Sequence, residues 1–246
     1  MLKEKVIEIK HYSDRLFSFK TTRDKTFRFK NGEFAMIGLD VDTTVKGSPL
    51  PKKTMRAYSI VSTNYDDHLE FLSIIVPDGP LTSKLKNLQI GDEILINPKV
   101  TGSLVCDYLN PKDNLVLLAT GTGVAPFVSI VNDPDTYSRF KKVYLFHTVR
   151  NVNELAYIES LNSIEEDLPF TYIPTVTRED YGRTGRFWQY VEEFLPDGFL
   201  KERDGIMVCG SPGMNKECRT LFKTLNWQEG NTGEMGDFML ERAFVD

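Results

Sequence analysis

NLVLLATGTGVAPFV, residues 114–128, indicates the architecture of this chain more clearly than any other segment. Its first seven residues are a nearly continuous apolar run, typical of a strand buried on both faces of a parallel sheet. The run leads into Gly121-Thr122-Gly123 and a helical pattern, and such a turn brings the backbone close to a phosphate. Pro126 occupies the third glycine position of the usual dinucleotide signature, so a strand-to-helix turn without a ligand stays an open alternative.

Downstream of this segment, buried strands alternate with helical patterns. Strands are predicted at 142–149, 169–177 and 205–210, with helices at 154–164 and 187–195. This order predicts an α/β domain built on a parallel sheet.

Upstream, the pattern is different. Residues 5–12, 15–22, 25–39, 55–62, 68–76 and 92–98 alternate or are rich in β-branched and aromatic side chains. Turn residues such as Asn31-Gly32 separate them, and only 82–88 has a helical pattern. We therefore predict a closed antiparallel β-barrel in residues 1–102 and the α/β domain in residues 103–246.

Composition excludes several classes of protein. The 246 residues are 41% hydrophobic and 26% charged, and no apolar run is long enough to span a membrane. The N-terminus lacks the apolar core of a secretory signal, so we expect a cytoplasmic protein with no membrane partner. The net charge of −5, without a dense Lys/Arg run, argues against nucleic-acid binding.

Cysteine and histidine are too sparse for a metal site. Three widely spaced cysteines argue against a disulfide framework and exclude a plant-type iron–sulfur module, and three distant histidines give no zinc signature. We expect no metal, so any redox chemistry requires an organic cofactor.

Four further segments carry candidate ligand-binding groups. Arg56-Ala57-Tyr58-Ser59 offers a cation for a pyrophosphate, a ring to stack and a hydroxyl, as a flavin requires, although an ordinary amphipathic strand has the same pattern. The turn at 77–83 brings hydroxyls to a helix start, either as an anion site or as a plain helix cap.

Three arginines and a cysteine follow in the second half. Arg150, Arg178 and Arg186 follow predicted strands or a glycine turn and can converge on a 2′-phosphate, or each can be a solvated surface charge. Cys209 can lie against a nicotinamide, or it is a buried structural cysteine.

The ordered set RAYS, PDGPLTSKL, LLATGTGVAPF, VCGSPGM and GDFMLERAFVD resembles the bacterial ferredoxin–NADP reductases over essentially the whole chain. The resemblance implies an FAD-binding barrel, an NADP-binding α/β domain and a C-terminal tail that returns to the flavin. It implies FAD and NADP(H) as cofactors, and ferredoxin or flavodoxin as a partner that docks transiently through electrostatic attraction. We expect a monomer whose Lys52 and Lys53 contribute a local positive face near the flavin edge.

The resemblance also implies roles for individual residues. The expected cofactor-binding residues are Arg56, Ala57, Tyr58, Ser59, Leu72, Ser73, Ile74, Ile75, Pro80, Leu81, Thr82, Thr122, Arg150, Arg178, Arg186, Ala243 and Phe244. Tyr58 is expected to pack on the isoalloxazine, and Phe244 to turn toward the FAD adenine. Ser59, Cys209 and Glu241 are the expected catalytic residues, which position the nicotinamide and handle the flavin proton.

Two rival functions share these features. A flavin reductase or an oxygenase-reductase component has the same two domains, although many of those carry an iron–sulfur module that this chain lacks. A nucleotide-binding regulatory or electron-transfer subunit without turnover is the second rival, and it would bind a flavin that NADPH does not bleach.

Overall fold

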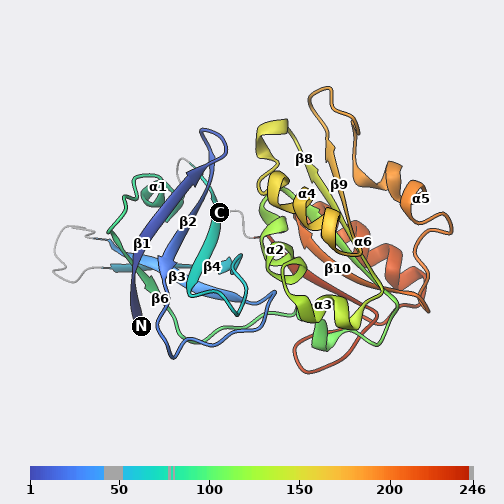
Figure 1. Ribbon diagram of the computed structural model, residues 1–246, viewed down its shortest axis with the longest axis horizontal. Coiled ribbons are helices and arrows are strands. Elements are labelled where there is room, and N and C mark those ends of the chain that lie inside the picture. The colour runs from blue at the N-terminus through green and yellow to red at the C-terminus, as the bar shows by residue number, and fades with distance from the viewer. Residues whose placement is uncertain (42–51, 77–78, 80, 244–246) are drawn as a thin grey trace.

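A computed structural model describes residues 1–41, 52–76, 79 and 81–243 of the chain. Two sheets lie side by side, an antiparallel one formed by the N-terminal residues and a parallel one formed by the C-terminal residues (Figure 1). The predicted Pro80 and Phe244 lie outside the described residues. No helix among those described is both long and apolar enough to cross a lipid bilayer.

The first sheet has six antiparallel strands in the order β4-β3-β6-β1-β2-β5. Their bounds are β1 (Leu2–His11), β2 (Leu16–Thr22), β3 (Phe34–Val41), β4 (Lys52–Ser59), β5 (His68–Ile74) and β6 (Glu93–Ile96). Ile60, just beyond β4, forms a bridge to Phe71 in β5, so the two edge strands of the sheet meet. The short helix α1 (Thr82–Leu85) follows β5. The predicted antiparallel barrel is thereby confirmed.

Strands β2 and β5 are buried on both faces. Phe19 and Phe71 point into the barrel core, whereas Leu16 and Leu72 belong to the same apolar cluster as Phe127 of the second half. Alternate residues of a strand point to opposite faces, so one face fills the barrel and the other packs against the α/β half. This shared apolar cluster holds the two halves together.

One predicted strand begins later than expected. Residues 25–30 alternate as a strand would, but β3 starts only at Phe34. Phe27 and Phe29 are buried in the barrel core, while the Phe27 carbonyl accepts a hydrogen bond of 3.0 Å from the Arg23 guanidinium instead of pairing with another strand. The alternation therefore reflects burial without a strand partner.

The second sheet has five parallel strands in the order β11-β10-β7-β8-β9. Their bounds are β7 (Asn114–Thr120), β8 (Lys142–Val149), β9 (Phe170–Val176), β10 (Asp204–Gly210) and β11 (Phe238–Arg242). Strands β7 and β8 occupy the predicted residues. The parallel α/β organisation is confirmed.

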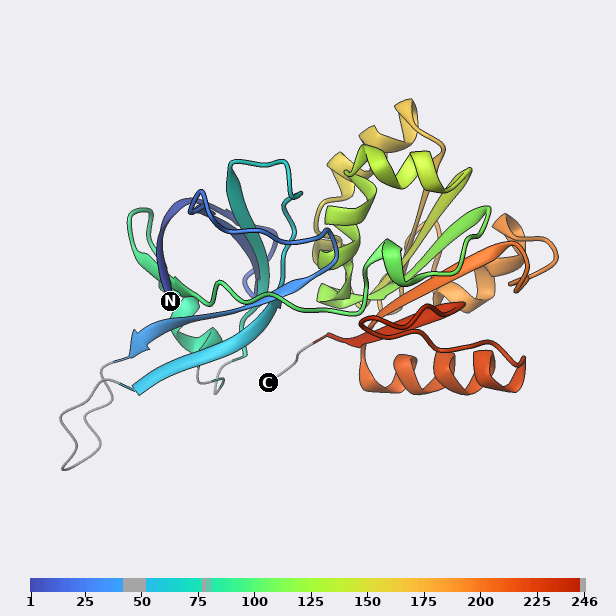
Figure 2. The same cartoon turned by 90° about the horizontal axis from the view of Figure 1, so that it is seen from below.

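Helices cover both faces of this sheet, with α6 on one side and α2 and α3 on the other (Figure 2). The bounds are α2 (Ala125–Val131), α3 (Pro134–Arg139), α4 (Ile158–Asp167), α5 (Val191–Phe194) and α6 (Pro212–Thr224). Leu117 of β7 packs with Phe127 of α2, and the next residue, Leu118, packs with Phe222 of α6. An apolar run on both faces is what this double cover requires.

Two predicted helices have different bounds in the structure. The helix predicted at 154–164 begins only at Ile158, because Tyr157 has a φ of 64°, which ends the preceding turn in a left-handed conformation. The helix predicted at 187–195 starts as a 3₁₀ turn, η4 (Phe187–Tyr190), and becomes α-helical at Val191.

Candidate functional site

The centre of the parallel sheet is a topological switch point. From β7 the chain proceeds to β8 and β9 on one side, while β10 and β11 lie on the other side. In open α/β sheets, ligands bind outside the carboxyl ends of the strands at this point. Here those ends are Thr120 of β7 and Gly210 of β10, and the glycine turn, η2 (Gly121–Val124), follows Thr120.

Two glycines of this turn are required by the backbone geometry. Gly121 has a φ of 55°, which an L-residue adopts only with strain. A Cβ on Gly123 would lie 2.1 Å from the Cys209 carbonyl oxygen, so the turn can approach β10 only without a side chain there. Backbone conformation and packing therefore explain part of the requirement for glycine at positions 121 and 123, without reference to a ligand.

His147 of β8 supports the glycine turn by a hydrogen bond to Gly121, a role that the sequence did not indicate. Its buried ring places Nε2 2.9 Å from the Gly121 carbonyl and Nδ1 3.1 Å from the Tyr172 hydroxyl. Burial lowers the pKa of His147 to about 4, so the ring is neutral at pH 7. Because a carbonyl oxygen only accepts hydrogen bonds, Nε2 carries the ring proton, and its N–H donates a hydrogen bond to the Gly121 carbonyl.

A cleft of about 350 Å³ lies over these strand ends. It is lined by Ser13, Arg15, Leu16, Ile74, Thr120, Gly121, Thr122, Thr148, Val149, Arg150, Glu154, Thr177, Arg186, Phe187, Trp188, Ser211, Gly213, Met214, Glu217 and Ala243. Of the predicted residues, Ile74, Thr122, Arg150, Arg186 and Ala243 are brought together here. We call this the nucleotide cleft.

The third predicted arginine does not line the nucleotide cleft. The Arg178 backbone N–H donates to the Arg150 carbonyl at 2.9 Å, so the two residues are neighbours, but the exposed Arg178 side chain is not part of the cleft wall. Arg186 forms an ion pair with Glu217 at 3.3 Å, and both side chains are exposed. An exposed pair of this kind is weak, so an incoming phosphate can replace the carboxylate.

A second cleft of about 50 Å³ lies between the barrel and the glycine turn. It is lined by Arg56, Ala57, Tyr58, Ser59, Leu72, Ile74, Val76, Thr82, Thr122, Ala125, Cys209 and Ala243. All of these except Val76 and Ala125 were predicted site residues. We call this the barrel cleft. It shares Ile74, Thr122 and Ala243 with the nucleotide cleft, so ligands in the two clefts would meet at these residues.

Supporting contacts hold the wall of the barrel cleft. A hydrogen bond of 3.1 Å joins the Tyr58 hydroxyl to Ser73, and the Tyr58 ring packs edge-on against Phe71. The Thr82 hydroxyl donates to the Val76 carbonyl at 3.2 Å, so it holds the turn before α1. Three predicted residues do not line the cleft: Ser73 supports Tyr58, while Ile75 and the buried Leu81 pack with the barrel core.

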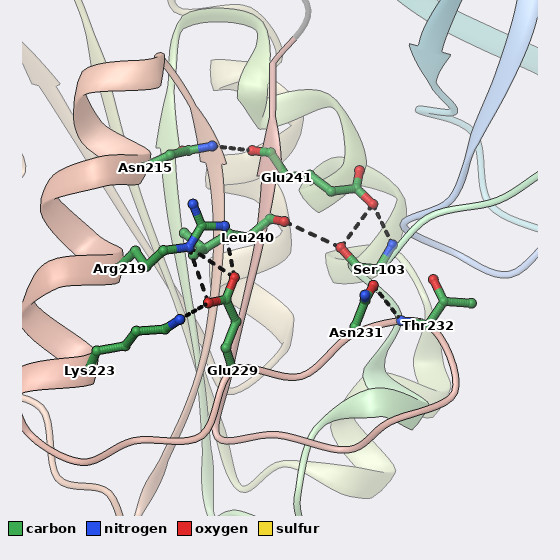
Figure 3. A network of polar contacts seen from close by, with 9 residues as sticks. All are labelled: Ser103, Asn215, Arg219, Lys223, Glu229, Asn231, Thr232, Leu240 and Glu241. Atoms are coloured by element: carbon green, nitrogen blue, oxygen red, sulfur yellow. Dashed lines mark hydrogen bonds and ion pairs between the residues drawn. The ribbon is translucent and has the colours of Figure 1, made fainter.

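Cys209 and Glu241 are neighbours in adjacent parallel strands, β10 and β11. Burial raises the pKa of Cys209 well above its usual value, so the thiol stays neutral in the barrel cleft. The Glu241 carboxylate accepts hydrogen bonds from the backbone N–H and the hydroxyl of Ser103, the latter at 3.2 Å (Figure 3). Glu241 lines neither of the two clefts.

Several residues of the nucleotide cleft are not predicted from the sequence. Ser211 caps α6 by accepting the Met214 N–H at 3.2 Å, and this helix begins at the cleft. The Ser-Pro-Gly sequence was a readable signal for that helix start. Arg15 and Trp188 come from a loop and a 3₁₀ turn, where no local pattern marks them.

The donor set fits a flavin in the barrel cleft and a dinucleotide in the nucleotide cleft. The barrel cleft combines an aromatic ring, aliphatic side chains and hydroxyls with one arginine, which suits a largely apolar ring system with a phosphate. The nucleotide cleft combines a glycine turn at a switch point, a helix N-terminus and three arginines.

Two domain families match the chain. The oxidoreductase FAD-binding domain matches residues 4–101, and the oxidoreductase NAD-binding domain matches residues 117–220. Together they cover most of the chain, one over each sheet.

Full-length relatives match as well. The chain is 44% identical to a ferredoxin–NADP reductase of Pseudomonas aeruginosa, over 99% of this chain and 97% of that protein. It is 45% identical to that of Azotobacter vinelandii, over the same shares. A crystal structure of a ferredoxin NADP⁺ reductase from Neisseria gonorrhoeae with bound FAD and NADP superposes with a TM-score of 0.87 at 30% identity, covering 99% of this chain and 98% of that one.

Proposed function

The chain belongs to the ferredoxin–NADP reductase family, and we propose that it transfers electrons between NADPH and a ferredoxin or flavodoxin by way of bound FAD. The observation that carries this function is the junction of the two clefts at Ile74, Thr122 and Ala243. FAD, when bound, supplies the exchange between two-electron and one-electron chemistry. The residues of the chain bind, orient and shield the reacting groups.

Residues of the barrel cleft would hold FAD. Tyr58 offers its ring to the isoalloxazine, and its hydrogen bond to Ser73 fixes the direction of that ring. Arg56 offers charge to the pyrophosphate, and Ser59 offers a hydroxyl in the same cleft.

Residues of the nucleotide cleft would hold NADPH. Arg150 and Arg186 are the proposed grip on the 2′-phosphate, with Arg178 as a longer-range positive charge. Thr122 and the neutral, small Cys209 would leave room for the nicotinamide beside the flavin.

We assign Ser59 and Cys209 as catalytic residues because both line the barrel cleft. Glu241 is better described as a positioning residue, since its carboxylate is bound to Ser103 and it acts through the strand beside Cys209. The proposed proton transfer to the flavin would then involve Ser59 rather than direct contact with Glu241.

We also propose that the enzyme is a cytoplasmic monomer that docks its partner transiently. A protein with a net charge of −5 can still attract an acidic partner through a local positive face. Lys52 and Lys53 begin β4, the strand that contains Arg56. Reversing both charges should slow ferredoxin reduction at low salt, and an unchanged rate would contradict this docking face.

Domain limits at 1–102 and 103–246, with a tail that returns to the flavin, complete the proposal. The last strand of the antiparallel sheet ends at Ile96 and the first strand of the parallel sheet begins at Asn114, which supports a limit between them. Ala243 lines both clefts, which supports a returning tail.

An absorption spectrum tests the function directly. The purified protein should show a flavin spectrum that NADPH bleaches anaerobically at a much lower concentration than NADH does. The Arg150→Ala, Arg186→Ala double variant should bind the same amount of flavin but lose the preference for NADPH. A protein that binds no FAD, or a bound flavin that NADPH leaves oxidised, would contradict the proposal.

A further inference from the structure

Asn31 makes a buried polar junction between the two halves of the molecule. Its side chain is 7% exposed and uses both ends of the amide. Nδ2 donates to Asp133 Oδ2 at 2.6 Å and to Asn64 Oδ1 at 3.4 Å. Oδ1 accepts the Asn64 backbone N–H at 2.8 Å and the Ser129 hydroxyl at 3.0 Å. One amide thus joins three separate segments of the chain.

These segments belong to different halves. Asn31 and Asn64 come from the barrel half, whereas Ser129 lies in α2 and Asp133 caps α3 by accepting the Asp135 N–H at 3.0 Å. The Ser129 hydroxyl is fully buried and also lies 3.0 Å from the Ser62 carbonyl. Since a hydroxyl has one proton, it is shared between the two acceptors.

On the α/β side, the junction is one helical turn from the clefts. Ser129 is four residues after Ala125, which lines the barrel cleft, and α2 follows the glycine turn that contains Thr122. The backbone hydrogen bonds of α2 make the segment between Ala125 and Ser129 rigid, so a displacement of Ser129 also moves the glycine turn that precedes the helix.

On the barrel side, the junction is connected to the flavin strand. Ser62 and Asn64 lie three and five residues beyond Ser59, the last residue of β4. Asn31 lies three residues before Phe34, which pairs with Ser59 across the β3–β4 ladder. Residues 59–64 therefore connect Ser59 to the Asn31 amide through Asn64. Residues 31–34 connect Asn31 to Phe34, the ladder partner of Ser59.

We propose that Asn31 and Ser129 are positioning residues that set the distance and angle between the barrel cleft and the nucleotide cleft. The inference rests on the proposed function. The apolar cluster shared by the two halves is non-directional and permits small sliding motions. The Asn31 amide is held on the barrel side by its two hydrogen bonds to Asn64, and its two bonds to Asp133 and Ser129 fix the direction in which the second half lies. Transfer between two bound rings is sensitive to displacements of about 1 Å, so this junction controls rate rather than affinity.

The variants are Asn31→Ala and Ser129→Ala, the second of which deletes only a hydroxyl. The matched control is Asn114→Ala, which also deletes an amide, in this case one that donates to Asp204 at 2.8 Å within the second half. Asn114 begins β7 at the end opposite the clefts. All three variants should bind FAD as the wild type does.

The first readout needs no cofactor turnover. Amide hydrogen exchange should be faster at Asn64 in both junction variants, because its N–H loses or loosens its acceptor, and unchanged in the control. Binding of 2′,5′-ADP, which occupies only the adenosine end of the nucleotide cleft, should be unchanged in all of them.

The second readout is stopped-flow reduction of bound FAD by saturating NADPH. Both junction variants should be slowed about tenfold to a hundredfold, with weaker charge-transfer absorbance between flavin and nicotinamide, while the control keeps the wild-type rate. Wild-type rates in junction variants that show faster Asn64 exchange would overturn the inference and leave the function intact. A wild-type flavin that NADPH does not bleach would overturn both.

Discussion

Glu241 and Ser103 join the last strand of the parallel sheet to the segment that leaves the barrel. The carboxylate accepts hydrogen bonds from both the backbone N–H and the hydroxyl of Ser103. Glu241 also lies beside Cys209, its register partner in the adjacent strand β10. The Glu241 carboxylate, which was expected beside the nicotinamide, is thus bound to Ser103 at the junction of the halves (Figure 3).

Glu241→Gln tests how this carboxyl contributes to stability. Burial raises the pKa of Glu241 above 4.5, against the opposing effect of the Ser103 hydrogen bonds. The folded protein therefore holds this proton more tightly than the unfolded chain. The resulting stabilisation is full below pH 4.5 and is lost as pH rises through the folded pKa.

The glutamine amide accepts the same hydrogen bonds and does not titrate. Urea unfolding from pH 4.5 to pH 8 should therefore show the wild type losing free energy of unfolding relative to Glu241→Gln as pH rises. Parallel curves for the two proteins would show that the Glu241 pKa is not raised.

Tyr58→Ala should weaken FAD binding about tenfold to a hundredfold, because the barrel cleft loses its aromatic wall. Tyr58→Phe keeps the ring and loses only the hydroxyl bonded to Ser73, so its effect should be about fivefold or less. Fluorescence titration of the apoprotein with FAD measures both. Tyr65→Ala, at an exposed tyrosine outside both clefts, is the control. Equal losses in Tyr58→Ala and Tyr65→Ala would remove Tyr58 from the flavin site.

The three arginines should differ in their effect on NADPH. Arg150→Ala and Arg186→Ala should each raise the KM for NADPH about tenfold with little change for NADH, since each removes one of the cleft arginines proposed to bind the 2′-phosphate. Arg178→Ala should have a smaller effect, because its exposed side chain does not line the nucleotide cleft. Steady-state reduction of a dye by each nucleotide gives the comparison. An Arg178→Ala effect equal to the other two would show that this side chain reaches the phosphate.

The sequence predicts the parts of this molecule that local patterns determine. The apolar run of β7 and the glycines at 121 and 123 are readable because burial on two faces and close backbone approach each permit few residue types. The start of α4 is not readable, since nothing local predicts the left-handed Tyr157, whose hydroxyl bonds Glu70 of the barrel at 2.8 Å. The partner of this side chain is 87 positions away in the sequence, so no local pattern reveals the contact.

Candidate site residues follow the same division. Arg56 to Ser59 lie on one strand, so their placement together needed only the strand itself. The direction of the Glu241 side chain depends on Ser103, a partner from another segment, and the junction at Asn31 likewise depends on Asp133. These are choices among equally allowed side-chain orientations, which periodicity does not encode.

His147→Leu tests the support beneath the glycine turn. The histidine pKa falls from 6.5 to about 4 on folding, so the unfolded chain binds a proton that the folded protein rejects. Stability is then full above pH 6.5 and falls by roughly 3 kcal/mol as pH is lowered to 4. Leucine does not titrate, so this part of the loss of unfolding free energy at acid pH should vanish.

Leucine also leaves the Gly121 carbonyl without its donor, so NADPH should bind more weakly while FAD content is kept. His68→Gln, at a half-exposed histidine of β5, is the control for both measurements. If His147→Leu keeps the wild-type slope between pH 4 and pH 6.5, or loses FAD and NADPH binding equally, His147 does not act through the turn.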